Sequence, residues 1–361
     1  MVKNLLFFLI FLTLFSSLTA VEKLRDYKLI NADSLIVTKI DEFYHTKLIG
    51  NVHFFYGNTE FYCDTANLDE KDKISKMIGN VKVYEDTLSL FASEAEYLRK
   101  REIIYLRINV KMFQLLPDST QNKFYSDYLT YYRSDSLVIA EQNVKAISEK
   151  QNITGECGYL KYYLNTHYGF MNKKPHIIRE EKEKLFEIYA QKIEYFGDYK
   201  KIVASYDVRT SFEKYHISGS FLLYYSETEK ATVIGNPKYF SDIATAYSQQ
   251  FDFHLKDNKI QTVDLTDSCK VYYKIKESDS LQDNYITAKN IHFAFDDEKL
   301  QQVTAVKDVT TYYNQKKSEK SDFVQNWVNG DSLTIEMEND KVKYLKLISA
   351  KEGKYYFEVE K

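Results

Sequence analysis

One short pattern recurs along this chain and limits the folds that are open to it. The tetrapeptide Ile-Gly-Asn-Val occurs at residues 49–52 and again at 78–81, 29 residues later. The stretch "FYCDTANL" follows the first copy and "LFASEAEY" follows the second, and each has a small residue between an apolar and a polar one. Similarity at a fixed period of roughly 20–50 residues is typical of stacked repeats.

The stretch can be aligned ten times when each copy is anchored on its small residue. The anchors are Ala32, Cys63, Ala92, Ser126, Gly155, Ala190, Gly219, Ser248, Ala288 and Gly330. Four of the nine intervals between successive anchors are 29 residues long, and polar insertions such as "LPDSTQNK" account for longer ones. We therefore expect one continuous repeat array over residues 21–361.

The columns of this alignment predict β-strands. The residue two before the anchor is apolar in all ten copies, the residue one after it is polar in all ten, and the residue five after it is again apolar. Side chains alternate between the faces of a strand, so apolar positions at −2, 0, +3 and +5 require one slip of parity. A bulge or kink at +1/+2 would return the apolar side chains to one face.

Each predicted strand is followed by a polar turn, such as "DEKDK", "RKRE" or "RSDS", and then by a weaker apolar stretch. We expect that stretch to be a return strand ending about 17 residues after the anchor, where Asn80, Asn109, Asn143, Asp207 and Asn236 lie. Neither strand of such a hairpin can bury its apolar face alone, whereas stacked copies bury one continuous core. The sequence thus predicts an all-β stack of about ten hairpins.

The first 20 residues differ from the rest. Lys3 precedes an apolar run from Leu5 to Phe15, and small residues follow up to Ala20. This is the layout of a secretory signal peptide, and the run is short for a membrane span, which needs about 20 residues. We expect cleavage after residues 1–20 and export; an uncleaved inner-membrane anchor is the alternative.

Composition and motifs argue against several functions. With 49 Lys and Arg against 52 Asp and Glu, the net charge of −3 gives no basic surface for nucleic acid. The chain has no HExxH, GxSxG, P-loop or GxGxxG motif, and its seven histidines are scattered, so we expect no enzyme, no cofactor and no metal site. The Asp residues at +1 are interpreted as hydrogen-bonding to backbone at the bulge. His254 and His292 should face outward.

Two features of the repeat resemble the OstA-like family of lipopolysaccharide-transport proteins, the LptA/LptC class. The first is a small residue followed by Asp, with apolar residues at +3 and +5, as in "YCDTANL" and "NGDSLTI". The second is Gly-Asn-Val at 50–52 and 79–81. The resemblance is clearest over residues 30–110 and degenerate over 120–350. It implies an elongated open β-jellyroll whose layers face each other across a groove for lipid acyl chains. It also implies edge-strand addition to other OstA-like jellyroll domains, here at residues 30–41 and 344–359.

The resulting hypothesis is a periplasmic bridge protein that shields lipopolysaccharide acyl chains during export to the outer membrane. The alternative is a structural β-repeat scaffold or surface protein that binds a protein partner without lipid. The inward columns predicted to line the groove are Phe61, Leu68, Leu90, Tyr97, Phe124, Leu129, Tyr131, Ile188, Ile193, Tyr195, Ile217, Leu222, Tyr224, Phe251, Phe253, Ile286, Ile291 and Phe293.

Overall fold

The computed structural model describes residues 27–181, 184–212, 215–257, 259–274, 284–297, 299–315, 323–338 and 341–357. The predicted signal peptide, residues 1–20, lies outside this range. The strands are β1 (Tyr27–Asn31), β2 (Ser34–Ile40), β3 (Phe43–Tyr56), β4 (Thr59–Asp69), β5 (Ile74–Glu85), β6 (Leu88–Leu98), β7 (Ile103–Leu115), β8 (Gln121–Tyr132), β9 (Leu137–Ser148), β10 (Ile153–Tyr163), β11 (Tyr168–Asn172), β12 (His176–Glu181), β13 (Lys184–Tyr189), β14 (Lys192–Phe196), β15 (Lys201–Phe212), β16 (Tyr215–Tyr225), β17 (Lys230–Ile234), β18 (Lys238–Phe240), β19 (Ala244–Tyr247), β20 (Gln250–Lys256), β21 (Lys259–Tyr273), β22 (Tyr285–Asp296), β23 (Lys299–Gln315), β24 (Val324–Glu338), β25 (Lys341–Ile348) and β26 (Glu352–Phe357).

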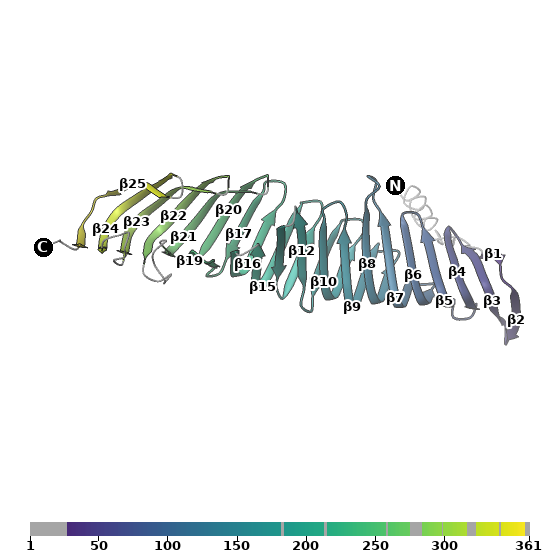
Figure 1. The fold of residues 1–361 in the computed structure, drawn as a ribbon. Helices are drawn as coiled ribbons and strands as arrows, with labels where there is room; N and C mark the ends of the chain where they lie inside the picture. Colours follow the sequence, from purple (N-terminus) through teal and green to yellow (C-terminus); the bar gives the residue numbers. More distant parts are fainter. Residues whose placement is uncertain are drawn as a thin grey trace, which may run out of the picture.

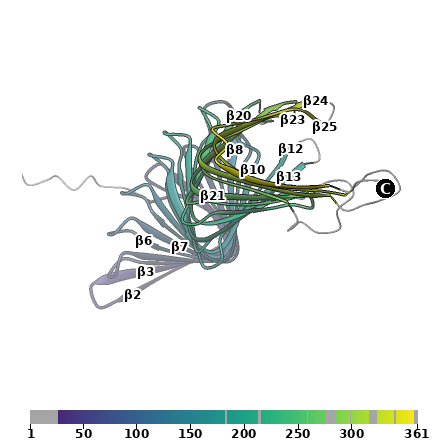
Figure 2. The same cartoon turned by 90° about the vertical axis from the view of Figure 1, so that its left-hand side faces the viewer.

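These strands form one antiparallel sheet of 26 strands that follow the chain along a long axis (Figure 1). In the view along that axis, the long strands bend near their middles, so that each contributes to two arms of a twisted trough (Figure 2). Short strands such as β11 and β12 contribute to one arm each, because they pair with separate halves of β10. We call the bend the corner. Layer A runs from the corner to turns such as 70–73, and layer B runs from the corner to turns such as 86–87. The prediction of an all-β stack is confirmed.

The corner lies at the Gly-Asn column of the sequence. Gly79 and Asn80 have φ of +79° and +48°, and β5 continues past them to Glu85. The prediction that return strands end at this column is therefore wrong at Asn80, Asn109, Asn143 and Asp207, which lie inside bent strands. It is confirmed at Asn236, because β17 ends at Ile234. Nine corners of the described residues contain two consecutive positive φ values. Asn and Gly suit this column because they enter the left-handed region with little steric penalty.

The predicted parity slip is confirmed, with one refinement. Phe61, Cys63, Ala66 and Leu68 are buried, so the inward face of β4 shifts between Cys63 and Ala66. Opposite Asp64, however, β3 places two residues, between Ile49 and Val52. The extra residue of the bulge thus belongs to the return strand, while the forward strand is kinked.

A side-chain contact fixes each well-formed corner. The Asn80 amide donates to both carboxylate oxygens of Asp64, at 3.2 and 3.0 Å. A Cβ on Gly79 would lie 2.1 Å from Asp64 Oδ2, so only glycine fits beneath the carboxylate. The same arrangement joins Asp33 to Asn51 above Gly50. These Asp side chains therefore accept from side-chain amides, which corrects the expectation of backbone partners.

We predict that Gly79→Ala lowers the free energy of unfolding by about 1–3 kcal/mol, because alanine meets both the positive φ and the Asp64 carboxylate. Urea unfolding followed by circular dichroism measures the change. Gly353→Ala is the matched control, since the nearest atom there is 3.3 Å away. Adding Asp64→Ala to Gly79→Ala should recover part of the lost stability. An unchanged urea midpoint in Gly79→Ala would contradict the account in which Asp64 and the positive φ require glycine at residue 79.

Candidate functional site in the trough interior

The structure places all eighteen predicted groove residues on the inward side, where they join one apolar cluster running along the trough. Fourteen of them are buried. The other four, Tyr195, Ile217, Tyr224 and Phe293, are half-buried and pack against that cluster. The column alignment therefore located the inward face correctly, while contact with lipid remains a prediction.

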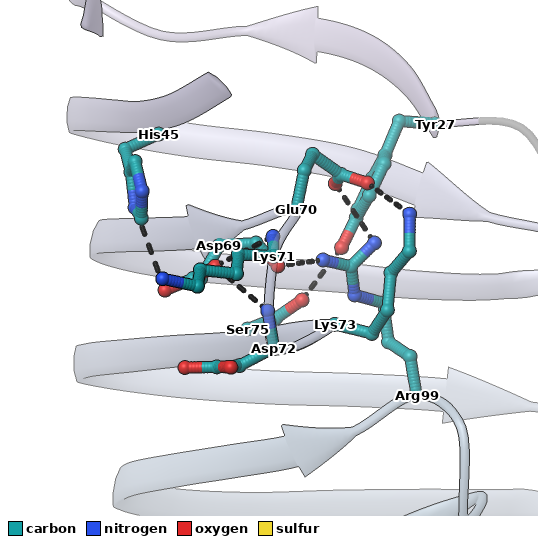
Figure 3. A network of polar contacts seen from close by, with 9 residues as sticks. All are labelled: Tyr27, His45, Asp69, Glu70, Lys71, Asp72, Lys73, Ser75 and Arg99. Atoms are coloured by element: carbon teal, nitrogen blue, oxygen red, sulfur yellow. Dashed lines mark hydrogen bonds and ion pairs between the residues drawn. The ribbon is translucent and has the colours of Figure 1, made fainter. Parts of the chain in front are cut away.

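The free margins of layers A and B border the open side of the trough, which we call the mouth. Near the N-terminal end, Arg99 of the turn after β6 closes it (Figure 3). The Arg99 guanidinium donates to Glu70 Oε1 at 2.8 Å and to the carbonyl oxygen of Asp69. It also lies 5.0 Å from the ring centroid of Tyr27, whose strand belongs to layer B. We call this group the Arg99 clasp.

The hydroxyl of Tyr27 completes the Arg99 clasp, because it is 2.6 Å from Ser75 Oγ in layer A (Figure 3). Lys73 donates to the second oxygen of Glu70 at 2.9 Å. Burial raises the pKa of Tyr27 well above its usual value, so the phenol stays neutral. The clasp therefore joins the two layers through a cation, an aromatic ring and hydrogen bonds.

A second closure, the Arg133 clasp, lies further along the mouth. Arg133, in the turn after β8, forms an ion pair with Glu85 at 2.5 Å and donates to Thr59 Oγ1 at 3.0 Å, both from layer B. It also donates to the Tyr97 hydroxyl at 2.6 Å. Burial is the largest influence and opposes the charge on Arg133, but the hydrogen bonds with Glu85 and the charges of Tyr97, Glu85 and Glu102 together outweigh it and raise the pKa of the guanidinium.

The residues at the mouth differ towards the C-terminal end. Seven residues after the anchor, where the N-terminal repeats place Arg99 and Arg133, the last three repeats place Leu255, Phe295 and Met337. These three apolar side chains are partly exposed, and Leu255 and Met337 pack against the apolar cluster. At this column, the mouth thus carries paired arginines at one end of the trough and partly exposed apolar side chains at the other.

Sequence reasoning missed both clasp arginines. Arg99 and Arg133 begin the segments "RKRE" and "RSDS", which were interpreted as polar turns. The signal that could have found them is their position at +7, which continues the inward series 0, +3 and +5. A long side chain at that position reaches across the mouth, because its stem is apolar and its head is charged.

The three cysteines are free thiols in β4, β10 and β21. Burial raises the pKa of the Cys63 thiol to about 12, and those of Cys157 and Cys269 to about 11. Little thiolate forms near neutral pH at such values, and the thiolate is the reactive form. They behave as small apolar residues of the stack.

The outer face carries a concavity of about 620 Å³ over β17 and β20–β23. His254 and His292 lie there, on the outer face as predicted, on either side of Asp264. His292 Nδ1 is 2.7 Å from an Asp264 oxygen. The described residues contain no group of three or more His, Cys, Asp or Glu side chains placed to hold a metal ion.

The described part of the chain also contains no helix long and apolar enough to span a bilayer.

Residues 27–185 match the family model of OstA-like protein, which confirms the resemblance over that range. Among solved structures, the crystal structure of LptH, the LptA homologous periplasmic component of the lipopolysaccharide transport device from Pseudomonas aeruginosa, matches with 18% identity and a TM-score of 0.30. The match covers 32% of this chain and 82% of that one. No curated protein gives a significant match.

We predict that Arg133→Met lowers the free energy of unfolding by about 2–3 kcal/mol, because it leaves the largely buried Glu85 carboxylate without its cation. Thermal unfolding measures the effect. The control Lys351→Met removes an exposed ion pair with Asp331 and should change stability little, because solvent already screens that pair. Equal effects of the two substitutions would show that the Arg133 clasp stabilises the fold no more than an exposed ion pair does.

Proposed function

Because residues 27–185 are OstA-like, we propose that this trough binds lipopolysaccharide or a related multi-acyl lipid and shields its acyl chains on the way to the outer membrane. The observation that carries the proposal is the single apolar cluster that runs inside the trough from Leu48 to Ile335. A lipid with several long chains needs an apolar surface of this extended kind, which a compact pocket does not offer.

The chemistry of such a site is simple. Each methylene group moved from water into the interior contributes about 0.8 kcal/mol, so a multi-acyl lipid gains a large total free energy from burial. Apolar contacts are not directional, and a chain can therefore slide along the trough without breaking specific bonds. The protein acts as a carrier surface rather than an enzyme, and any work is done by partner proteins.

The proposed location is the periplasm, reached through the signal peptide at residues 1–20. In this compartment, a lipid that has left one membrane must cross water before it enters the next. The protein lowers the free energy of that crossing by keeping the acyl chains covered. No cofactor is required for this role.

The ends of the stack are the proposed docking points for other OstA-like jellyroll domains. At the first edge, β1 and β2 pair with β3, and at the last, β25 and β26 pair with β24. Apolar side chains are exposed at both edges, including Val37 at 52% and Phe357 at 60%. An open strand edge with apolar side chains accepts a further strand.

A second candidate is a structural β-repeat scaffold that binds a protein partner without lipid. The observation that favours it is the packing of the N-terminal repeats, where Phe61 and Leu90 are 0% exposed. Their neighbours already cover them completely. That part of the trough is a finished core in its own right.

The lipid proposal predicts that Tyr224→Asp and Tyr225→Asp behave differently. Tyr224 is half-buried on the inward side, whereas its neighbour Tyr225 is 38% exposed on the outer side. A carboxylate at residue 224 would be desolvated by bound acyl chains, so Tyr224→Asp should weaken binding of lipopolysaccharide about tenfold, or about 1.4 kcal/mol. Binding is measured by mass spectrometry of lipid retained after gel filtration. Failure of the wild-type protein to retain lipid would rule out the proposal.

The docking proposal predicts that a photo-crosslinker at Ile36 or Phe357 captures another jellyroll domain or a second copy of this chain. Both side chains are exposed, at 48% and 60%. The same crosslinker at the inward residue Leu222, in the middle of the stack, is the control and should capture no protein. Capture at Leu222 with none at either end would contradict docking through the ends.

A further inference from the structure

The interior of the trough is divided into two segments of different character. In β4–β9, the +7 positions beside the mouth are held by Arg99 and Arg133, whose side chains are 4% and 11% exposed. In β20–β24, the same +7 column carries Leu255, Phe295 and Met337, which are partly exposed. Phe253 and Ile335, one step closer to the corner, are still 8% and 9% exposed, so the opening is confined to the margin.

Polar pairs across the mouth explain the closure of the first segment. The Arg99 clasp joins Glu70 and Ser75 of the layer A side to Tyr27 of layer B. The Arg133 clasp joins the layer A turn to Glu85 and Thr59 of layer B. The arginine side chains are only 4% and 11% exposed, so these pairs lie within the protein and are not surface contacts.

The two segments therefore differ in what they offer an acyl chain. A chain entering beside Leu255 or Phe295 meets partly exposed apolar side chains where the N-terminal repeats place the two arginines, so it separates neither of the two arginine pairs. A chain entering between β4 and β9 must first separate buried ion pairs, which leaves a charge uncompensated. It must also displace side chains that fill the interior.

We propose that acyl chains load from the side into the segment β20–β24, and that the Arg99 and Arg133 clasps keep the segment β4–β9 closed to lipid. This inference rests on the proposed lipid-carrier function and names the part of the trough that performs it. The N-terminal segment then serves as a rigid stem with a dry core. The Arg133 clasp, the one nearer the loading segment, marks the limit of the lipid site.

A crosslinking experiment tests the proposal. Phe124 and Phe295 are both inward phenylalanines, in β8 and β22, and each is replaced in turn by p-benzoylphenylalanine in the full chain. The protein is mixed with micelles of lipopolysaccharide, irradiated, and analysed by mass spectrometry for lipid adducts. We expect adducts at residue 295 and at least tenfold fewer at residue 124. Tyr131 and Phe293, which share the +5 column, form a second pair in case the Phe124 variant does not fold.

Opening the clasp provides the internal control. Arg133→Met should raise the adduct yield at residue 124 towards that at residue 295, while Lys351→Met should not. Equal yields at 124 and 295 with the clasp intact would overturn the division into two segments and leave the carrier function standing. Adducts at neither residue would contradict both the loading segment and the carrier function.

Discussion

The fold depends on the bend at the corner of each strand. Two consecutive residues with positive φ, such as Gly79 and Asn80, turn the backbone without ending the strand. The Asp64 carboxylate holds the Asn80 amide and occupies the space that a Cβ on Gly79 would need. Because the bend recurs along the stack, each long strand belongs to both layers, and pairs of short strands such as β17 and β18 take the place of one long strand elsewhere. A trough with one continuous interior follows from this constraint, and a flat sheet would have no interior.

Within that trough, the same inward columns serve two purposes. Near the N-terminal end they pack into a dry core, and Arg99 and Arg133 join the layers across the mouth. Near the C-terminal end, apolar residues such as Phe295 occupy the mouth and remain half-exposed. Under the loading proposal, repetition in sequence does not mean repetition in role, since a change at a single column separates a segment that is closed to lipid from one that is open to it.

The sequence predicted the stack, the inward face and the place of the parity slip, because apolar periodicity determines which side chains are buried. It did not predict where the return strands end, since the turn-like residue Asn80 is used inside a strand, where the bend needs a positive φ. It also missed the clasps: whether an arginine in a polar turn is solvated or spans the mouth depends on the distance between two layers. Local sequence does not encode that distance.

The central claim is that the trough interior holds acyl chains, and native mass spectrometry of the full-length protein isolated from its own periplasm tests it most directly. The account predicts a mass equal to protein plus a multi-acyl lipid, which returns to the protein mass after extraction with organic solvent. A protein that shows only its own mass, before and after extraction, would contradict the claim and favour a scaffold without lipid.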